Sequence, residues 1–170
     1  MGALKLLGLG LTAWQSTVRM QMWVEQQRKY QEASAYAQQQ RKPLLVVGGP
    51  YGSPFLGKLL HIQVHGCGDV CLDLAAEACE RCPEVSEADV RQIPFADGHF
   101  AAAYVSHVLE HLPSVADCQL AIDELYRVAD RVWVMAPPPS FLYAWVVPGH
   151  HLWVKQVGEA EFRIQPWPNT

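Results

Sequence analysis

Hydrophobic residues fall in short uninterrupted runs along most of the chain, after a long polar and apolar mixture at the amino end. Residues 12–40 contain no Gly or Pro and consist mainly of helix-forming residues, so they predict one long helix. After Pro43, uncharged or β-branched runs at residues 44–47, 100–106 and 131–136 predict strands, the middle one buried on both faces. The pattern predicts an α/β fold: an open, mostly parallel sheet with flanking helices.

Further elements are expected between and after these runs. Residues 69–74 predict a second strand, and a brief strand follows near Val85. Ser114 follows Pro113 and opens an amphipathic helix. The apolar face expected for this helix comprises Leu120, Ala121, Leu125 and Val128. Residues 152–157 and 161–164, around Gly158, predict a closing antiparallel hairpin.

Two shorter helices are expected between the predicted strands at residues 44–47 and near Val85. Ser53 and Pro54 form a suitable N-cap and first-turn pair for a helix that reaches toward His61. A second helix is expected from Ala75 to Arg81.

The long helix and its uncharged beginning allow two interpretations. Residues 6–18 carry no charge, but they are too few to cross a membrane and no small-x-small cleavage site follows them. Trp14, Val18, Met22 and Trp23 recur at roughly helical spacing, so the early turns are expected to contact apolar material. Packing on the protein's own sheet or on a partner subunit is favoured over contact with a membrane surface.

A second apolar segment lies near the carboxyl end. Residues 132–154 contain no Asp, Glu, Lys or Arg, yet prolines interrupt them, so they do not form a plain membrane helix. Residues Phe141–Val147 are expected to form a hydrophobic flap or a protein contact, with packing against the N-terminal helix as the alternative.

Composition bounds the domain organisation and the partners. With 170 residues, half of them apolar, the chain suits one domain, with residues 1–42 as a helical extension and 43–170 as the α/β domain. The net charge of −4 gives no basic excess for a phosphate backbone, so we expect no nucleic acid partner.

The chain has five cysteines, an odd number. An odd number does not suggest a disulfide framework, so we expect free thiols and a cytoplasmic location, with peripheral contact at the membrane left open. Cys67, Cys71, Cys79 and Cys82 also suggest a zinc site, but the spacing on a strand and a following helix argues against their convergence.

The strand after Pro43 ends in a glycine-rich stretch that contains Gly48, Gly49 and Gly52. Such a loop lets the backbone approach a ligand closely, or it is simply a tight connection from strand to helix. About twenty residues further on, Asp73 follows the next strand and can accept hydrogen bonds from both ribose hydroxyls of a nucleoside. The alternative is that Asp73 only caps the helix that follows.

The segment A-D-V-x-x-I-P-F-x-D-x-x-F at residues 88–100 and H-V-L-E-H-L at 107–112 resemble class I S-adenosylmethionine-dependent methyltransferases of the small-molecule type. The resemblance spans roughly residues 43–137 and implies a Rossmann-like sheet that binds S-adenosylmethionine. It implies that Asp89 accepts from the adenine amino group while the Val90 backbone meets the ring, whereas Asp89 is otherwise a solvated turn residue. The cofactor-binding residues that it implies are Gly48, Gly49, Gly52, Asp73, Leu74, Asp89, Val90 and Ser106.

The chain departs from the family pattern in the first motif. Val46 stands in the place of an acidic residue that helps hold the amino-acid portion of the cofactor, and Pro50 stands in the place of the middle glycine. Proline fixes φ and removes an N–H, so this loop offers one backbone donor fewer than the family pattern implies. Family members also carry further elements before the closing hairpin, so we expect a reduced substrate side.

Two functions therefore remain. The first is methyl transfer to a small, apolar acceptor, with His107 or His111 as a base if the acceptor is an acid. The second is an inactive methyltransferase-like scaffold that contacts a partner through the N-terminal helix and residues Phe141–Val147. His107 and His111 also fit the H-x-x-E-H pattern of zinc proteases, but only a short helix precedes Pro113, so no metal is expected.

Overall fold

A computed structural model describes residues 2–50 and 63–168, and the helix expected from Ser53 toward His61 lies outside this part. Its described residues contain a five-stranded sheet in the order β3-β2-β1-β4-β5, and every neighbouring pair is parallel. This confirms the expected open α/β sheet of the Rossmann-like kind. The strands are β1 (Leu44–Val47), β2 (Val70–Asp73), β3 (Glu84–Glu87), β4 (Phe100–Ser106) and β5 (Ala129–Met135).

The strand order reverses direction between β1 and β4. From β1 the chain builds β2 and β3 on one side, whereas β4 and β5 lie on the other, and Val47 pairs with both Leu72 and Val105. Because all five strands are parallel, their carboxyl ends lie at one edge of the sheet. Ligands of open α/β sheets bind at this edge, where the strand order reverses.

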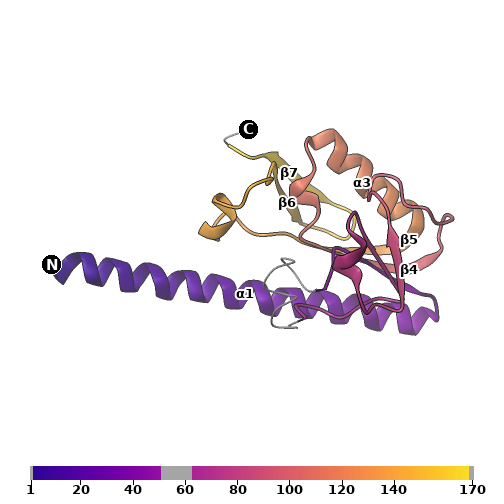
Figure 1. Cartoon of the computed structure of the whole chain (residues 1–170), viewed down its shortest axis with the longest axis horizontal. Coiled ribbons are helices and arrows are strands. Elements are labelled where there is room, and N and C mark those ends of the chain that lie inside the picture. Colours follow the sequence, from indigo (N-terminus) through magenta and orange to yellow (C-terminus); the bar gives the residue numbers. More distant parts are fainter. Residues whose placement is uncertain (1, 51–62, 169–170) are drawn as a thin grey trace.

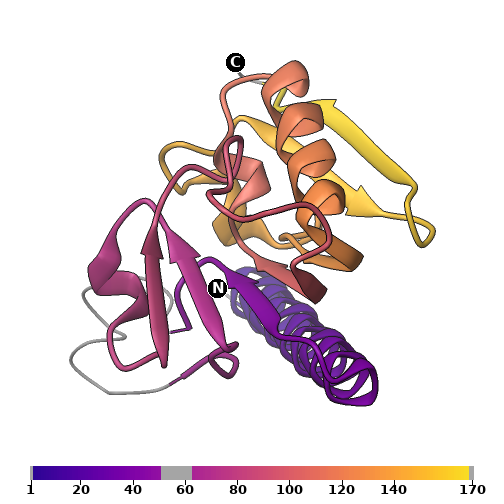
Figure 2. The same cartoon turned by 90° about the vertical axis from the view of Figure 1, so that its right-hand side faces the viewer.

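The two faces of the sheet are covered by different elements, as Figures 1 and 2 show. Leu44 and Val46 point toward α1 (Gly2–Gln40), whereas Leu45 and Val47 point toward α3 (Val115–Val128) and the β6-β7 hairpin. This alternation follows from the period of two along a strand. All seven residues of β4 are buried, which explains why this run contains no charge and tolerates three alanines between two helical layers.

Helix α1 starts earlier than its sequence pattern predicts and extends past the sheet at its N-terminal end (Figure 1). Ala33 and Ala37 are buried against the sheet, so the second half of α1 forms part of the core. The helix ends at Gln40, because Arg41 adopts a left-handed φ of 55° and Pro43 follows.

The first half of α1 contacts the rest of the protein less closely. Val18 is buried, but Trp14 and Trp23, which were expected on the same apolar stripe, are 46% and 53% exposed. Among the described residues, no helix is sufficiently long and apolar to span a membrane.

Helix α3 begins as predicted, because the Ser114 hydroxyl caps it by accepting from the Asp117 N–H. The prediction of its buried face was wrong at Leu120, which is half exposed. Cys118 and Ile122 are buried instead. The helix expected from Ala75 to Arg81 is also wrong, since a short 3-10 helix, η1 (Ala76–Cys79), occupies this place. The closing hairpin is confirmed as β6 (Leu152–Gln156) and β7 (Phe162–Pro166).

Within the expected flap Phe141–Val147, residues Leu142–Trp145 form the 3-10 helix η3. Ala144 is buried among aromatic rings that include Trp153 and Trp167, whereas Tyr143 and Val146 are largely exposed. The Gln15 side chain accepts from the Leu142 N–H at 2.9 Å and donates to the Ser140 carbonyl at 3.0 Å. The flap is therefore anchored on α1 and on the tryptophan cluster, and it still exposes apolar residues.

Four of the five cysteines are disulfide-bonded, as Cys67–Cys82 and Cys71–Cys79. The expectation of free thiols is wrong for these four, and so is the argument that they cannot converge. The reason is that η1 replaces the expected helix and folds back over β2, which brings the sulfurs into one cluster. Cys118, in α3, is free and buried. The cysteine content therefore no longer favours a reducing compartment.

The disulfides give a direct chemical prediction. Protein isolated without reductant and unfolded in denaturant should react with a thiol reagent at one site per chain, Cys118, and at five sites after reduction. The double variant Cys67→Ser and Cys82→Ser removes a bridge across 15 residues, which should lower the free energy of unfolding by about 3 kcal/mol. Five reactive thiols before reduction would contradict the pairing.

Candidate functional site

The candidate site residues lie at the carboxyl edge of the sheet. Gly48 follows β1, Asp73 ends β2, Asp89 follows β3 by two residues, and Ser106 ends β4 with His107 next to it. The parallel pairing thus brings to one edge four segments that are far apart in the sequence. Gly52 lies outside the described residues.

The described part of the glycine-rich loop is tightly held. Gly48 adopts a φ of 91°, and a Cβ there would overlap the Ser106 carbonyl oxygen, so only glycine fits between β1 and β4. The Gly48 N–H donates to the Leu72 carbonyl, and the Gly49 N–H donates to Asp73 Oδ2, each at 3.0 Å. The N–H groups of Gly48 and Gly49 are therefore already engaged. Position 50 offers no donor, because proline has no N–H.

Asp73 accepts a hydrogen bond at each carboxylate oxygen. Oδ2 accepts from Gly49, and Oδ1 accepts from the Ala75 N–H at 3.0 Å. Each oxygen keeps a further lone pair, because a carboxylate has about four acceptor positions. Beside it, Leu74 is 71% exposed. An acceptor group next to an exposed apolar side chain suits a ribose with its attached base.

Asp89 is paired more strongly than its sequence context suggests. Both of its carboxylate oxygens accept from the Arg91 guanidinium, and the shortest bond is 2.6 Å from Nη2 to Oδ2. Arg91 also donates to Asp117 at 2.7 Å, which links the turn after β3 to the first turn of α3. Val90 is buried in the core, so only its backbone is available at the edge. No pattern in the sequence singles out Arg91.

Ser106 is buried under α1. Its hydroxyl accepts from the Gln26 side chain at 3.1 Å, and Gln26 is itself 7% exposed. Lys29, one turn further along α1, donates to the Val134 carbonyl at 2.6 Å. These bonds connect α1 to the carboxyl halves of β4 and β5, which the sequence did not indicate because Gln26 looks like one of many glutamines in a surface helix.

His107 forms a pair with Glu110. Its Nδ1 lies 3.1 Å from Glu110 Oε1, and its backbone has a φ of 56°, which is unusual for a residue other than glycine. Burial opposes a charge on His107, but the hydrogen bond and the negative charge of Glu110 outweigh it and raise the pKa of His107. Burial likewise opposes ionisation of Glu110, but the same partner lowers the pKa of Glu110. His107 can act as a base only in its neutral form, which the pairing with Glu110 disfavours.

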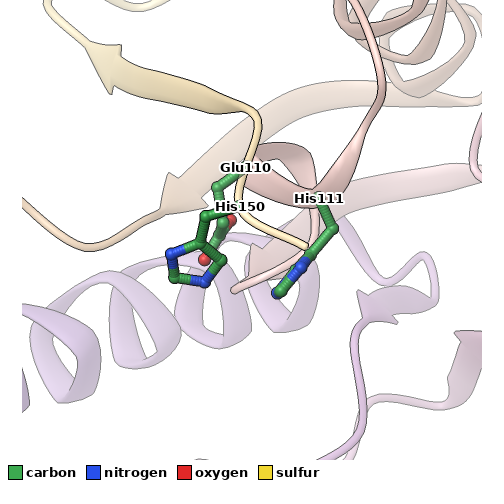
Figure 3. A group of neighbouring side chains, drawn as sticks. All are labelled: Glu110, His111 and His150. Carbon is green, nitrogen blue, oxygen red and sulfur yellow. The ribbon is translucent and has the colours of Figure 1, made fainter. Parts of the chain in front are cut away.

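His111 lies on η2 (Leu109–His111) beside Glu110, and His150 approaches both from the segment before β6 (Figure 3). One nitrogen or oxygen from each of these three side chains lies within 4.8 Å of the others. The imidazole rings of His111 and His150 are 4.6 Å apart and meet edge to face. His107 and His111 were expected from the sequence, whereas the approach of His150, which is far away in the sequence, was not.

A hollow of about 520 Å³ also lies at the opposite, amino edge of the sheet, between α1 and β1. Tyr30, Arg41 and Asp69 are among its lining residues. It is well separated from the loops described above, because β1 begins at one edge and ends at the other.

The Arg91 pairs predict a difference in acid stability. The hydrogen bonds of Arg91 with Asp89 lower the pKa of Asp89, and those of Ser114 and Arg91 lower the pKa of Asp117. A lowered carboxyl pKa stabilises the fold above the ordinary value of about 3.9, and this stabilisation disappears as the pH falls through the folded-state pKa. Arg91→Gln should therefore lower the melting temperature at neutral pH, with a gap from wild type that narrows below about pH 4.

The same thermal scans include a change common to both proteins and one control variant. Burial lowers the pKa of His65 to about 4, so both proteins should lose stability between about pH 6.5 and pH 4, where the unfolded state binds the proton. Arg28→Gln, which removes an exposed pair with Glu32 on α1, should follow the wild-type curve. A constant gap between Arg91→Gln and wild type down to pH 2 would contradict the prediction.

Comparison with known proteins adds sequence evidence to this geometry. Residues 57–131 match the family model described as a methyltransferase domain. This segment includes β2, β3 and β4, and the glycine-rich loop lies before it. The resemblance inferred from residues 88–112 is therefore confirmed. Comparison with curated proteins finds no match.

Several solved structures are similar to the chain at 15–20% identity. The [4+2]-cyclase SpnF has 20% identity and a TM-score of 0.38, over 54% of this chain and 37% of the cyclase. The N-methyltransferase NodS from Bradyrhizobium japonicum WM9, solved in complex with S-adenosyl-L-homocysteine, has 16% identity and a TM-score of 0.46, over 76% of each chain. The PH0226 protein from Pyrococcus horikoshii OT3 has 15% identity and a TM-score of 0.42, over 70% of this chain and 59% of that one.

Proposed function

We propose that this chain, whose residues 57–131 match a methyltransferase domain, binds S-adenosylmethionine at the carboxyl edge of its sheet and transfers a methyl group to a small acceptor. The observation that carries the proposal is the position of Asp73 with Leu74 at this edge, beside the reversal of strand order between β1 and β4. The methyltransferase-domain match supports S-adenosylmethionine as the cofactor.

The residues at the edge fit such a ligand in their chemistry. Asp73 has free lone pairs for the ribose hydroxyls, and the exposed Leu74 side chain offers an apolar surface to the base. Asp89 follows β3 by two residues, and its carboxylate already accepts from the Arg91 N–H and from the Arg91 guanidinium. An exocyclic amino group at this position would share an Asp89 oxygen with Arg91. Gly48 keeps the β1 loop close to β4 and leaves no side chain in the way.

Methyl transfer requires little more from the protein than alignment of donor and acceptor. When bound, the cofactor supplies an electrophilic sulfonium methyl group. His107 and His111 follow β4 at the same edge, where either can receive a proton from an acidic acceptor. Since Glu110 favours the protonated form of His107, His107 can equally orient an acceptor oxygen by donating a hydrogen bond.

We further propose an acceptor with an apolar body. The exposed residues of the flap support it: Leu142, Tyr143 and Val146 are 41%, 65% and 72% exposed. His150, which accompanies His111, donates to the carbonyl of Ala144 in the same flap at 3.0 Å. The flap is thus tied to the histidines that follow β4, so an acceptor that reaches them would contact it.

A catalytically inactive scaffold is the second candidate. It is favoured by the engaged N–H groups of Gly48 and Gly49 and by Pro50, which leave few donors for an amino-acid carboxylate. The exposed Trp14 and Trp23 of α1, with the flap, would then contact a protein partner or a membrane surface. Cofactor binding distinguishes the two candidates.

Calorimetric titration of the full chain with S-adenosylmethionine tests the first candidate. Wild type should bind with micromolar affinity, and Asp73→Asn should bind about 10- to 100-fold more weakly, because hydrogen bonds to a charged group contribute about 1.5–3 kcal/mol. Asp130→Asn is the matched control. Asp130 lies near the amino end of β5, where it pairs with Lys42, and its loss should leave the affinity unchanged.

Thermal unfolding of both variants completes the experiment. Asp73→Asn retains one oxygen that can accept from Gly49 or Ala75, so it should unfold cooperatively like wild type. A folded wild-type protein that gives no heat with the cofactor would refute the proposal and favour the scaffold.

A further inference from the structure

The cluster of Glu110, His111 and His150 has features that methyl transfer does not require. Two of its members are adjacent on η2, and the third comes from the segment before β6, 39 residues after His111 in the sequence. Figure 3 shows the three side chains directed toward a common space. Neutral histidines and a carboxylate are the ligand types that divalent transition metals prefer.

Hydrogen bonds determine the free atom of each histidine. His111 Nδ1 lies 3.0 Å from the Gly149 carbonyl oxygen, and His150 Nδ1 lies 3.0 Å from the Ala144 carbonyl oxygen. A carbonyl only accepts, so each Nδ1 must carry the proton, and in a neutral ring Nε2 then has a free lone pair. Histidines that bind metals are commonly oriented in this way, by a backbone carbonyl on the other nitrogen.

Glu110 shows the corresponding asymmetry between its two oxygens. Oε1 accepts from His107, whereas Oε2 is buried and has no hydrogen-bond partner in the part of the chain that the structure describes. The side chain is 0% exposed. A buried carboxylate oxygen without a hydrogen-bond partner is costly, because nothing replaces the water that it has lost. A buried, unpaired carboxylate oxygen in a side chain that converges with two histidines is the arrangement expected of a cation site.

The backbone holds the two segments in fixed positions. The His151 N–H donates to the Glu110 carbonyl at 2.8 Å, and the Trp167 N–H donates to the His151 carbonyl at 2.7 Å. The His150 ring also meets the Trp167 ring edge to face at 5.4 Å. The three side chains therefore converge through tertiary structure that is already formed.

We propose that Glu110 Oε2, His111 Nε2 and His150 Nε2 bind one divalent transition-metal ion of the zinc type. The set has two imidazoles and one carboxylate, as in zinc sites that keep a position open for water or substrate. One ligand atom of each side chain lies within 4.8 Å of the others, and metal–ligand distances of about 2.0–2.2 Å require the three side chains to approach one another more closely. This proposal replaces the expectation of no metal, and the H-x-x-E-H motif contributes Glu110 and His111, with His107 as a partner of Glu110.

The position of the proposed ion suggests a role for it. Two of its ligands, Glu110 and His111, lie shortly after His107 in the segment that follows β4, at the edge proposed for the cofactor. An open coordination position would bind an oxygen of the acceptor and lower its pKa. With the ion bound, both ring nitrogens of His111 are engaged, so His107 is the base of the proposed reaction. The role of the ion in the reaction depends on the proposed function, and metal binding itself does not.

Titration of the tag-free, full-length protein with Co²⁺ tests the site. Co²⁺ with a low coordination number absorbs visible light, so we expect an absorption spectrum that saturates at one ion per chain. The spectrum should disappear when Zn²⁺ displaces Co²⁺. Mg²⁺ should not displace Co²⁺, because it prefers oxygen ligands in an octahedral arrangement. Glu110→Gln, His111→Ala and His150→Ala should each weaken binding by at least about 10-fold.

His99→Ala is the matched control. This exposed histidine precedes β4 at the amino edge, and its loss should leave Co²⁺ binding unchanged. Circular dichroism checks the fold of each variant. Glu110→Gln preserves side-chain size, and His150→Ala alters a loop, so at least these two should fold.

Absence of a saturable spectrum in folded wild type, or binding that persists in the folded variants, would overturn the proposal. The test needs no cofactor, so its result is independent of the titration with S-adenosylmethionine. A protein that binds Co²⁺ but not the cofactor would retain the metal site and refute the methyltransferase proposal.

Discussion

The direct pairing of β1 with β4 determines the position of nearly every feature of this protein. The two strands come from segments more than fifty residues apart, and their parallel alignment brings Gly48 and Ser106 together at one edge. The fit is so close there that a Cβ on Gly48 would overlap the Ser106 carbonyl. Because each strand is buried on both faces, the register cannot slip without moving apolar side chains out of both layers.

The helix α1 makes this arrangement part of a larger unit. Ala33 and Ala37 allow it to approach the sheet, and Gln26 and Lys29 bond to Ser106 and to the Val134 carbonyl. A helix that begins far outside the sheet is therefore in contact with the end of β4, where the turn containing His107 starts. The carboxyl edge thus has α1 on one side and α3 with the β6-β7 hairpin on the other.

Features that depend on local pattern could be predicted from the sequence. The β4 run of Phe100–Ser106, the Ser114 cap and the β6-β7 hairpin follow from apolar runs, capping residues and turn residues, and all are present. Features that depend on tertiary proximity could not. The disulfides form because the short helix η1 brings the cysteines together, where the sequence predicted a longer helix. His150 reaches Glu110 because the segment before β6 pairs with η2, and no sequence pattern gives that position.

The orientation of the sheet is coupled to that of the N-terminal end of α1, because one unbroken helix joins the two. The 39 residues of α1 span about 58 Å at 1.5 Å per residue. Leu9 and Trp14 are exposed on the protruding half, and Ala37 is fixed in the interior of the domain. A contact that fixed the exposed half of α1 would therefore also fix the orientation of the sheet and of its carboxyl edge.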